Sequence, residues 1–133
     1  MNNNKFSTEE LKKIIKEDDL KISPFREDGK TYGTPTWIWA VEVDGDLYVR
    51  AYNGINSRWY QSALTQKAGR IHAAGMVINV NFETVNDKSL NKKIDEAYQA
   101  KYTKSPYLPP MISDRARKTT IKIIILPSFQ TTV

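Results

Sequence analysis

Two strand-like segments separated by one tight turn, residues 36–52, constrain the fold of this chain most strongly. Residues 36–43 and 47–52 are rich in β-branched and aromatic side chains, and Asp44 and Gly45 lie in the gap between them. An Asp-Gly pair favours a hairpin turn, because glycine readily adopts the positive φ that such a turn requires. The pattern therefore predicts two antiparallel strands.

Other patterns predict three helices and further strands. Ser7 and Glu10 match a capping box, and apolar residues follow at helical spacing. Asn56 or Ser57 is suited to cap a second helix, and Gly69 to end it. Helices are expected at about residues 8–17, 57–67 and 89–101, with one helical turn near 111–115. Strands are expected at 20–22, 70–73, 76–85 and 119–126, with a turn at Ala74-Gly75 and a stop at Pro127.

This order of elements predicts an α+β domain with a mainly antiparallel sheet and helices packed outside it. Short strands hide their edges when a sheet closes, which favours a small barrel. A length of 133 residues is the usual size of one domain. We expect a single domain spanning residues 1–133, with flexible tails at 1–6 and 128–133.

Composition excludes several chemistries. The chain has no cysteine, so thiolate metal sites and cysteine nucleophiles are absent, and its single histidine, His72, cannot form a histidine cluster. No apolar run is long enough to span a membrane and no signal peptide is recognisable, so a cytoplasmic location is expected. The net charge of +5 favours an anionic partner. Nucleic acid is the least favoured partner, because the basic residues do not form a stripe.

The central hairpin has two alternative registers. A two-residue turn places Arg50 opposite Trp39 on one face. A glycine bulge instead shifts the pairing by one residue and moves both Trp37 and Trp39 into the core. In both registers Tyr48, Arg50 and Tyr52 alternate onto the same face. An arginine between two tyrosines suits a phosphate beside a stacking surface. The alternative is an outer sheet face covered by a helix, with Arg50 paired to a carboxylate.

The turn at residues 53–58, after the second strand of this hairpin, leads directly into the second predicted helix. Free amides at a helix N-terminus attract anions, Gly54 permits close backbone approach, and Arg58 adds a full charge. Plain helix capping beside an exposed arginine explains the same residues. After this helix, Lys67 and Arg70 flank Gly69, and Arg70 is a further candidate for anion binding. Arg115, Arg117 and Lys118 form a basic cluster that is either a solvated segment or closes over an anion.

These segments resemble a known family. ISPFREDG, TPTWIW, RAYNG, SRWYQ, AYQAKY and SPYL are similar to a small bacterial family catalogued as domain of unknown function 2255, over about residues 20–126. That family is more distantly similar to the flavin and deazaflavin split-barrel proteins. The shared pattern is Thr34-Pro35 with Trp37, Gly45, Asn53-Gly54, Trp59-Tyr60, Leu64 and Lys67.

The resemblance implies a split β-barrel of about six strands, a homodimer, and FMN or a deazaflavin in a groove near the dimer interface. The strand arginine and the loop after it would meet the phosphate. The implied cofactor-binding residues are Arg50, Tyr52, Asn53, Gly54, Ser57, Arg58, Lys67 and Arg70. We therefore expect either a flavin- or deazaflavin-dependent oxidoreductase-like protein, whose cofactor performs the chemistry, or a non-catalytic binder of an anionic small molecule.

Overall fold

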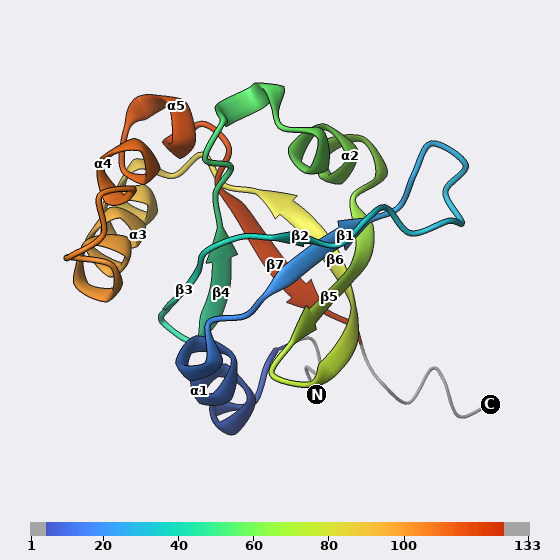
Figure 1. The fold of residues 1–133 in the computed structure, drawn as a ribbon, viewed down its shortest axis with the longest axis horizontal. Coiled ribbons are helices and arrows are strands. Elements are labelled where there is room, and N and C mark those ends of the chain that lie inside the picture. Colours follow the sequence, from blue (N-terminus) through green and yellow to red (C-terminus); the bar gives the residue numbers. More distant parts are fainter. Residues whose placement is uncertain (1–4, 127–133) are drawn as a thin grey trace.

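The computed structural model describes residues 5–126 and has the predicted α+β class. Seven antiparallel strands form one sheet in the order β2-β1-β5-β6-β7-β4-β3. The sheet curls into a half-barrel with helices packed around it (Figure 1). The predicted stop at Pro127 and the predicted tail at 128–133 lie outside the described residues.

The elements follow the predicted order with shifted boundaries. The strands are β1 (Lys21–Pro24), β2 (Thr36–Trp37), β3 (Ala40–Val43), β4 (Asp46–Val49), β5 (Ala68–Ala73), β6 (Met76–Thr84) and β7 (Ile121–Ile125). The helices are α1 (Thr8–Glu17), α2 (Arg58–Gln66), α3 (Lys88–Lys101), α4 (Leu108–Met111) and α5 (Asp114–Arg117), with a 3-10 turn, η1 (Gly54–Asn56), before α2. The capping box at Ser7 and Glu10 is present.

The central hairpin has the register of the two-residue turn. Val43 pairs with Asp46, and both turn residues have positive φ, 52° at Asp44 and 88° at Gly45. This geometry matches the right-handed twist of the flanking strands. Along each strand of the hairpin, successive residues therefore alternate between two hydrophobic cores. The predicted strand at 36–43 is interrupted, however, because β2 pairs with β1 whereas β3 pairs with β4. The sheet consequently has seven strands rather than six.

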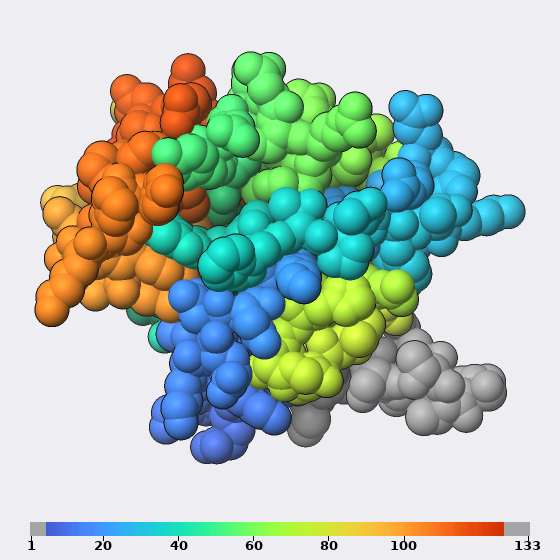
Figure 2. Space-filling model, in the orientation of Figure 1, coloured from blue at the N-terminus to red at the C-terminus, as the bar shows by residue number. Residues whose placement is uncertain are grey.

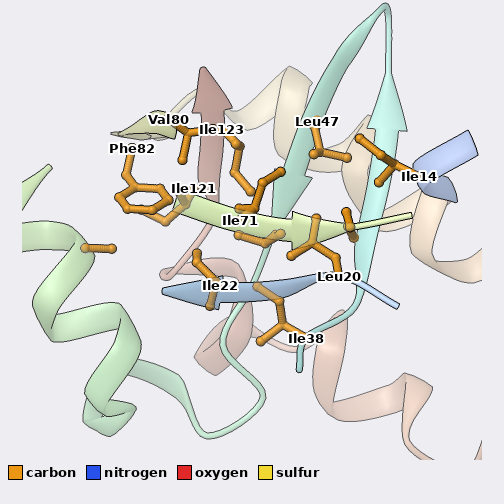
Figure 3. Close-up of a cluster of buried hydrophobic side chains, with 14 of the residues drawn as sticks. Ile14, Leu20, Ile22, Ile38, Leu47, Ile71, Val80, Phe82, Ile121 and Ile123 are labelled. Atoms are coloured by element: carbon orange, nitrogen blue, oxygen red, sulfur yellow. The ribbon is translucent and has the colours of Figure 1, made fainter. Parts of the chain in front are cut away.

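The larger core fills the concave side of the half-barrel (Figure 3). Helices α1 and α2 contribute to it, and every strand except β2 places apolar side chains there. The labelled members are Ile14, Leu20, Ile22, Ile38, Leu47, Ile71, Val80, Phe82, Ile121 and Ile123. Full burial of each such side chain contributes about 1.5–3 kcal/mol.

A second core lies on the opposite face of β3 and β4, under α3. Val41 and Tyr48 pack there against Ile94 and Tyr98, which are fully buried. Helix α3 therefore covers the outer face of this hairpin. The outer face of β6 is different, because Val77 is 59% exposed there.

Two predictions about chain ends and helix ends are wrong. Phe6 is buried in the larger core, so the predicted flexible start at residues 1–6 extends too far. Helix α2 ends at Gln66, with Lys67 as its C-cap at a left-handed φ of 60°, and not at Gly69. Gly69 lies within β5 against β1, where an added Cβ would be 2.5 Å from the Cα of Pro24. This glycine permits close strand packing rather than ending a helix.

Candidate functional site

A pocket of about 470 Å³ opens between β2, the segment from the end of β4 to the start of α2, and α4. In Figure 2 these three segments, coloured teal, green and orange, meet around a hollow. Its lining consists of Thr36, Trp37, Ile38, Trp39, Arg50, Tyr52, Asn53, Ser57, Arg58, Trp59, Tyr107 and Met111. This volume lies within the range of about 300–1,000 Å³ typical of small-molecule sites.

A series of hydrogen bonds from backbone amides shapes one side of the pocket. The polypeptide leaves β4 after Val49, and the Ala51 N–H then donates to the side-chain oxygen Thr119 Oγ1 at 2.8 Å. The Gly54 N–H donates to the Ala51 carbonyl at 3.0 Å, and the Ser57 N–H donates to the Gly54 carbonyl at 3.1 Å. Gly54 has φ of +71°, a conformation that glycine adopts without steric cost. These turns direct residues 52–53 and 57–58 toward the same cavity.

The first turn of α2 offers amides without helical partners. Ser57 is the N-cap, but its side chain makes no capping hydrogen bond, and this turn contains no acidic residue. The first bond within the helix runs from the Gln61 N–H to the Ser57 carbonyl. The three amides before Gln61 therefore lack partners within the helix. Together with the helix dipole, they favour an anion at this end of the pocket.

Arg58 lies at the same helix start and adds a positive charge. Its side chain is exposed, and within residues 5–126 it forms no ion pair. A guanidinium donates two parallel hydrogen bonds to phosphate or carboxylate oxygens. The pocket therefore has a cationic, hydrogen-bond-donating end.

Aromatic rings gather around the rest of the pocket. Trp37 is 63% exposed, Tyr107 59% and Tyr52 40%, although large aromatic side chains are usually buried. Tyr52 meets Tyr107 edge to face, with 6.0 Å between the ring centroids. Grouped exposed rings are typical of ligand sites, because their faces are available for stacking.

Trp39 forms a rigid wall of the pocket. It stacks on Tyr102 at 3.8 Å with almost parallel rings, and the Tyr102 hydroxyl donates to Asp18 at 2.6 Å. Burial, followed by the contact with Asp18, raises the pKa of Tyr102, so its hydroxyl remains a donor. Lys101 also lies 3.0 Å from Asp18, and burial lowers the pKa of this lysine. The position of Trp39 is therefore fixed from behind.

Arg50 differs from its predicted role as a phosphate ligand. Its guanidinium is fully buried under α3 and lies 5.5 Å from the ring centroid of Tyr98. Its five N–H groups match five hydrogen bonds, which reach the side chains of Asp95, Asn91 and Thr120 and the carbonyls of Asn91 and Met111. The alternative reading, an arginine paired to a carboxylate beneath a helix, describes this geometry. Arg50 forms part of the pocket wall but has no N–H group left to donate.

The other predicted site residues fall into two groups. Tyr52, Asn53, Ser57 and Arg58 line the pocket, and Gly54 is buried in the turn between them. Lys67 and Arg70 do not line it. Lys67 borders a separate hollow beside α2 and β6, and Arg70 lies on the outer face of β5, with its guanidinium 3.8 Å from the Tyr32 ring centroid.

Sequence reasoning did not identify the contribution of α4. Tyr107 and Met111 reach the pocket from a segment about 55 residues beyond Tyr52. The only local signal is an aromatic residue shortly before Pro109 and Pro110. These two prolines keep the helical segment short and irregular. Nothing in that pattern indicates which cavity Tyr107 borders.

Catalytic groups are scarce around the pocket. Its lining residues, all within the described part of the chain, include no aspartate, glutamate, histidine or lysine. His72 lies on β5, and its Nε2 atom is buried without a hydrogen-bond partner in the structure. Across residues 5–126, no group of three or more acidic or histidine side chains is placed to hold a metal ion. The side chains that the lining offers for polar contacts include those of arginine, tyrosine, serine, threonine and asparagine.

The fold defines a split-barrel protein of the α+β class. Residues 10–123 match the family model described as "Uncharacterized protein conserved in bacteria (DUF2255)", and the chain belongs to this family. The search of curated proteins gave no match. No helix within residues 5–126 is both long and apolar enough to cross a lipid bilayer.

Solved structures share the fold at low sequence identity. A "Putative Pyridoxamine 5'-phosphate oxidase" from Listeria innocua superposes with a TM-score of 0.61 at 10% identity, covering 90% of this chain and 91% of that one. A conserved hypothetical protein from Mycobacterium tuberculosis gives 0.62 at 12% identity, covering 96% and 85%. A FAD-binding protein from Mesorhizobium loti gives 0.51 at 14% identity, covering 92% and 91%. At these identities the likeness extends to the fold alone.

Proposed function

We propose that this protein binds a flavin-type cofactor, FMN or a deazaflavin, in the pocket between β2, α2 and α4. The observation that carries the proposal is the pairing of exposed aromatic rings with a cationic helix start around one cavity of about 470 Å³. A flavin has a planar ring system at one end and an anionic phosphate at the other. The aromatic and the cationic residues of the lining offer the matching chemistry.

The residues divide the ligand between them. Trp37, Tyr52 and Tyr107 would hold the ring system through stacking and edge contacts. Arg58 and the first amides of α2 would hold the phosphate, with the Ser57 hydroxyl beside them. Asn53 adds an amide side chain to the pocket lining, as a further hydrogen-bonding group. Arg50 contributes packing to the wall and no phosphate contact.

A bound flavin would supply hydride and electron transfer. The chain would bind it, orient it and shield one side of its ring system. This division fits a lining without aspartate, glutamate, histidine or lysine. The printed names of two structural neighbours, a FAD-binding protein and a "Putative Pyridoxamine 5'-phosphate oxidase", also support a ligand of this class. The proposed protein class is thus a flavin- or deazaflavin-dependent oxidoreductase-like protein.

The experiment is a visible absorption spectrum of the purified protein, followed by titration with FMN. Trp37→Ala removes a 63% exposed ring at the pocket, and Leu64→Ala, which trims a 41% exposed side chain on α2 outside the pocket lining, is the matched control. We expect wild type and Leu64→Ala to bind FMN equally and Trp37→Ala to bind it more weakly. Absence of both a bound chromophore and any titratable affinity would overturn the proposal.

A non-catalytic role is the second candidate. The absence of aspartate, glutamate, histidine and lysine among the lining residues favours it as much as it favours a cofactor-driven reaction. In this case the pocket would hold an anionic aromatic metabolite that is not redox-active. Mass spectrometry of molecules released when the protein is denatured distinguishes the two, because a flavin and a non-redox metabolite differ in mass and absorption.

We also propose a homodimer. The outer face of β5 and β6 supports this, since Val77 is 59% exposed there. A second copy packed on this face would cover Val77. Light scattering should give the mass of a dimer for the wild type and of a monomer for Val77→Asp. Ile55→Asp, at another exposed apolar residue, is the control. A monomeric wild type would contradict the proposal.

A further inference from the structure

The two arginines of α5 have opposite environments. Arg117 forms ion pairs with Asp95 and Asp114. Arg115 is exposed and forms no ion pair within residues 5–126. Its guanidinium carbon instead lies 5.9 Å from the centroid of the Tyr52 ring, which borders the pocket. One arginine of α5 therefore stabilises the fold, and the other lies beside the proposed ligand site.

Gly54 allows Arg115 to approach this site. An ideal Cβ built on Gly54 would lie 2.6 Å from Arg115 Cγ and 3.2 Å from its Cδ. Any other residue would therefore push the arginine stem away from the η1 turn. The glycine at this turn thus has two functions: it accepts a positive φ, and it leaves room for a cation from a distant helix.

The charges around the pocket do not balance. The lining includes no carboxylate. Of the three nearby arginines, Arg50 is neutralised by Asp95, whereas Arg58 and Arg115 have no acidic partner in the described chain. Asp114, the acidic neighbour of Arg115 in the sequence, is paired with Arg117 instead. Two full positive charges thus lie on or against the segment of residues 52–58, because Arg58 belongs to it and Arg115 contacts Gly54 and the Tyr52 ring.

We infer that Arg115 is a second anion-binding residue of the pocket and that the pocket selects a ligand whose anionic end carries two negative charges. This inference rests on the proposed function and specifies the ligand within it. A phosphate monoester, as in FMN, meets the requirement, whereas the same ring system without phosphate does not. Charge-assisted hydrogen bonds from guanidinium to phosphate are the stronger kind, so the discrimination should be large.

The test compares FMN with riboflavin, which has the same rings and no phosphate. Dissociation constants are measured for wild type, Arg115→Ala and Lys118→Ala by quenching of flavin fluorescence. Lys118 is an exposed cation at the end of α5 and controls for net charge. We expect Arg115→Ala to weaken FMN binding about tenfold or more and riboflavin binding less than about twofold. Lys118→Ala should change each less than about twofold, and added salt should weaken wild-type FMN binding more steeply than that of Arg115→Ala.

The outcomes separate this inference from the proposed function. If wild type binds neither flavin, the proposed function is overturned. If wild type binds FMN and Arg115→Ala behaves like Lys118→Ala, only the inference about Arg115 fails. Equal losses for FMN and riboflavin would also overturn it, because they would mean that Arg115 acts by supporting the Tyr52 ring and not through its charge. Urea unfolding of each variant checks that the fold is retained.

Discussion

Arg50 and Arg58 lie eight residues apart in one motif, yet the molecule uses them in opposite ways. Arg50 is buried beneath α3, and its donors are all engaged with the protein. Arg58 is exposed at an uncapped helix start beside a cavity. The comparison teaches that cations close together in sequence can be separated by strand parity and helix cover, one for folding and one for a ligand.

The energetic consequences of the two sites differ as well. Removing one member of a buried ion pair leaves the other charge desolvated, which costs far more than removing an exposed charge. Variants beneath α3 should therefore alter stability, and variants at the pocket should alter binding. The following predictions test that separation.

The largest expected effect is on the side of β3 and β4 that helix α3 covers, here called the covered side. Asp95→Ala leaves the Arg50 guanidinium buried without its carboxylate, and we expect a loss of about 3–5 kcal/mol in the free energy of unfolding. Urea denaturation measures this value. Glu96→Ala, at an exposed carboxylate on the same helix, is the control and should change it by less than about 0.5 kcal/mol. Equal behaviour of the two variants would contradict the structural role of Arg50.

A smaller stability effect is expected where the two regions meet. Gly54→Ala introduces a side chain at positive φ, which costs about 1–2 kcal/mol, and it also displaces Arg115. Gly75→Ala is the control, since this glycine has φ of +79° and no atom within 4 Å of an added Cβ. Both variants should lose stability in urea denaturation, but only Gly54→Ala should also weaken FMN binding. Unchanged FMN affinity in Gly54→Ala would separate the turn from the site.

A change at the pocket should leave stability almost unaltered. Tyr107→Ala removes a 59% exposed ring that meets Tyr52 edge to face. Aromatic contacts of this kind contribute about 0.5–1.5 kcal/mol, so we expect a several-fold loss of flavin affinity. Thermal unfolding should be close to wild type. A clear loss of stability with unchanged affinity would place Tyr107 in the fold and not in the site.

The smallest effect on stability at neutral pH concerns the tyrosine hydroxyls on the covered side. It becomes measurable only at alkaline pH. Burial, followed by the charge of Asp46, raises the pKa of Tyr48 from 10.0 to about 12. The unfolded chain then releases this proton at a lower pH than the folded chain, so stability is complete below pH 10 and is lost as pH rises through about 12. Burial raises the pKa of Tyr98 in the same direction. Urea denaturation across this range should show a shallower decline for Tyr48→Phe than for wild type, and parallel slopes would refute the assignment.

Local patterns predicted much of the fold. The turn at Asp44-Gly45, the capping box at Ser7 and the alternation along β6 each depend on neighbouring residues, and the structure has all three. The register of the central hairpin remained ambiguous, because a two-residue turn and a bulge fit the same letters. The structure decides between them, because Ala40 pairs with Val49 and Val41 packs with Tyr48 under α3.

The candidate site was less predictable, because its parts come together through the fold. The residues from 52 to 58 were identified from one continuous motif. The use of Arg50 depends on Asp95, which is 45 residues away, and neither α4 nor Arg115 has a local signal that points to the pocket. Charge and spacing alone do not show which cation has already found a carboxylate.

The most direct test of the anion-binding role proposed for Arg58 is an isothermal titration of FMN into wild type and Arg58→Ala, with urea denaturation of the same samples. Lys12→Ala, at an exposed cation on α1, controls for charge. We expect Arg58→Ala to bind FMN about tenfold more weakly or worse, while its free energy of unfolding stays within about 0.5 kcal/mol of wild type. Undiminished FMN affinity in Arg58→Ala, or no affinity in the wild type, would contradict this role.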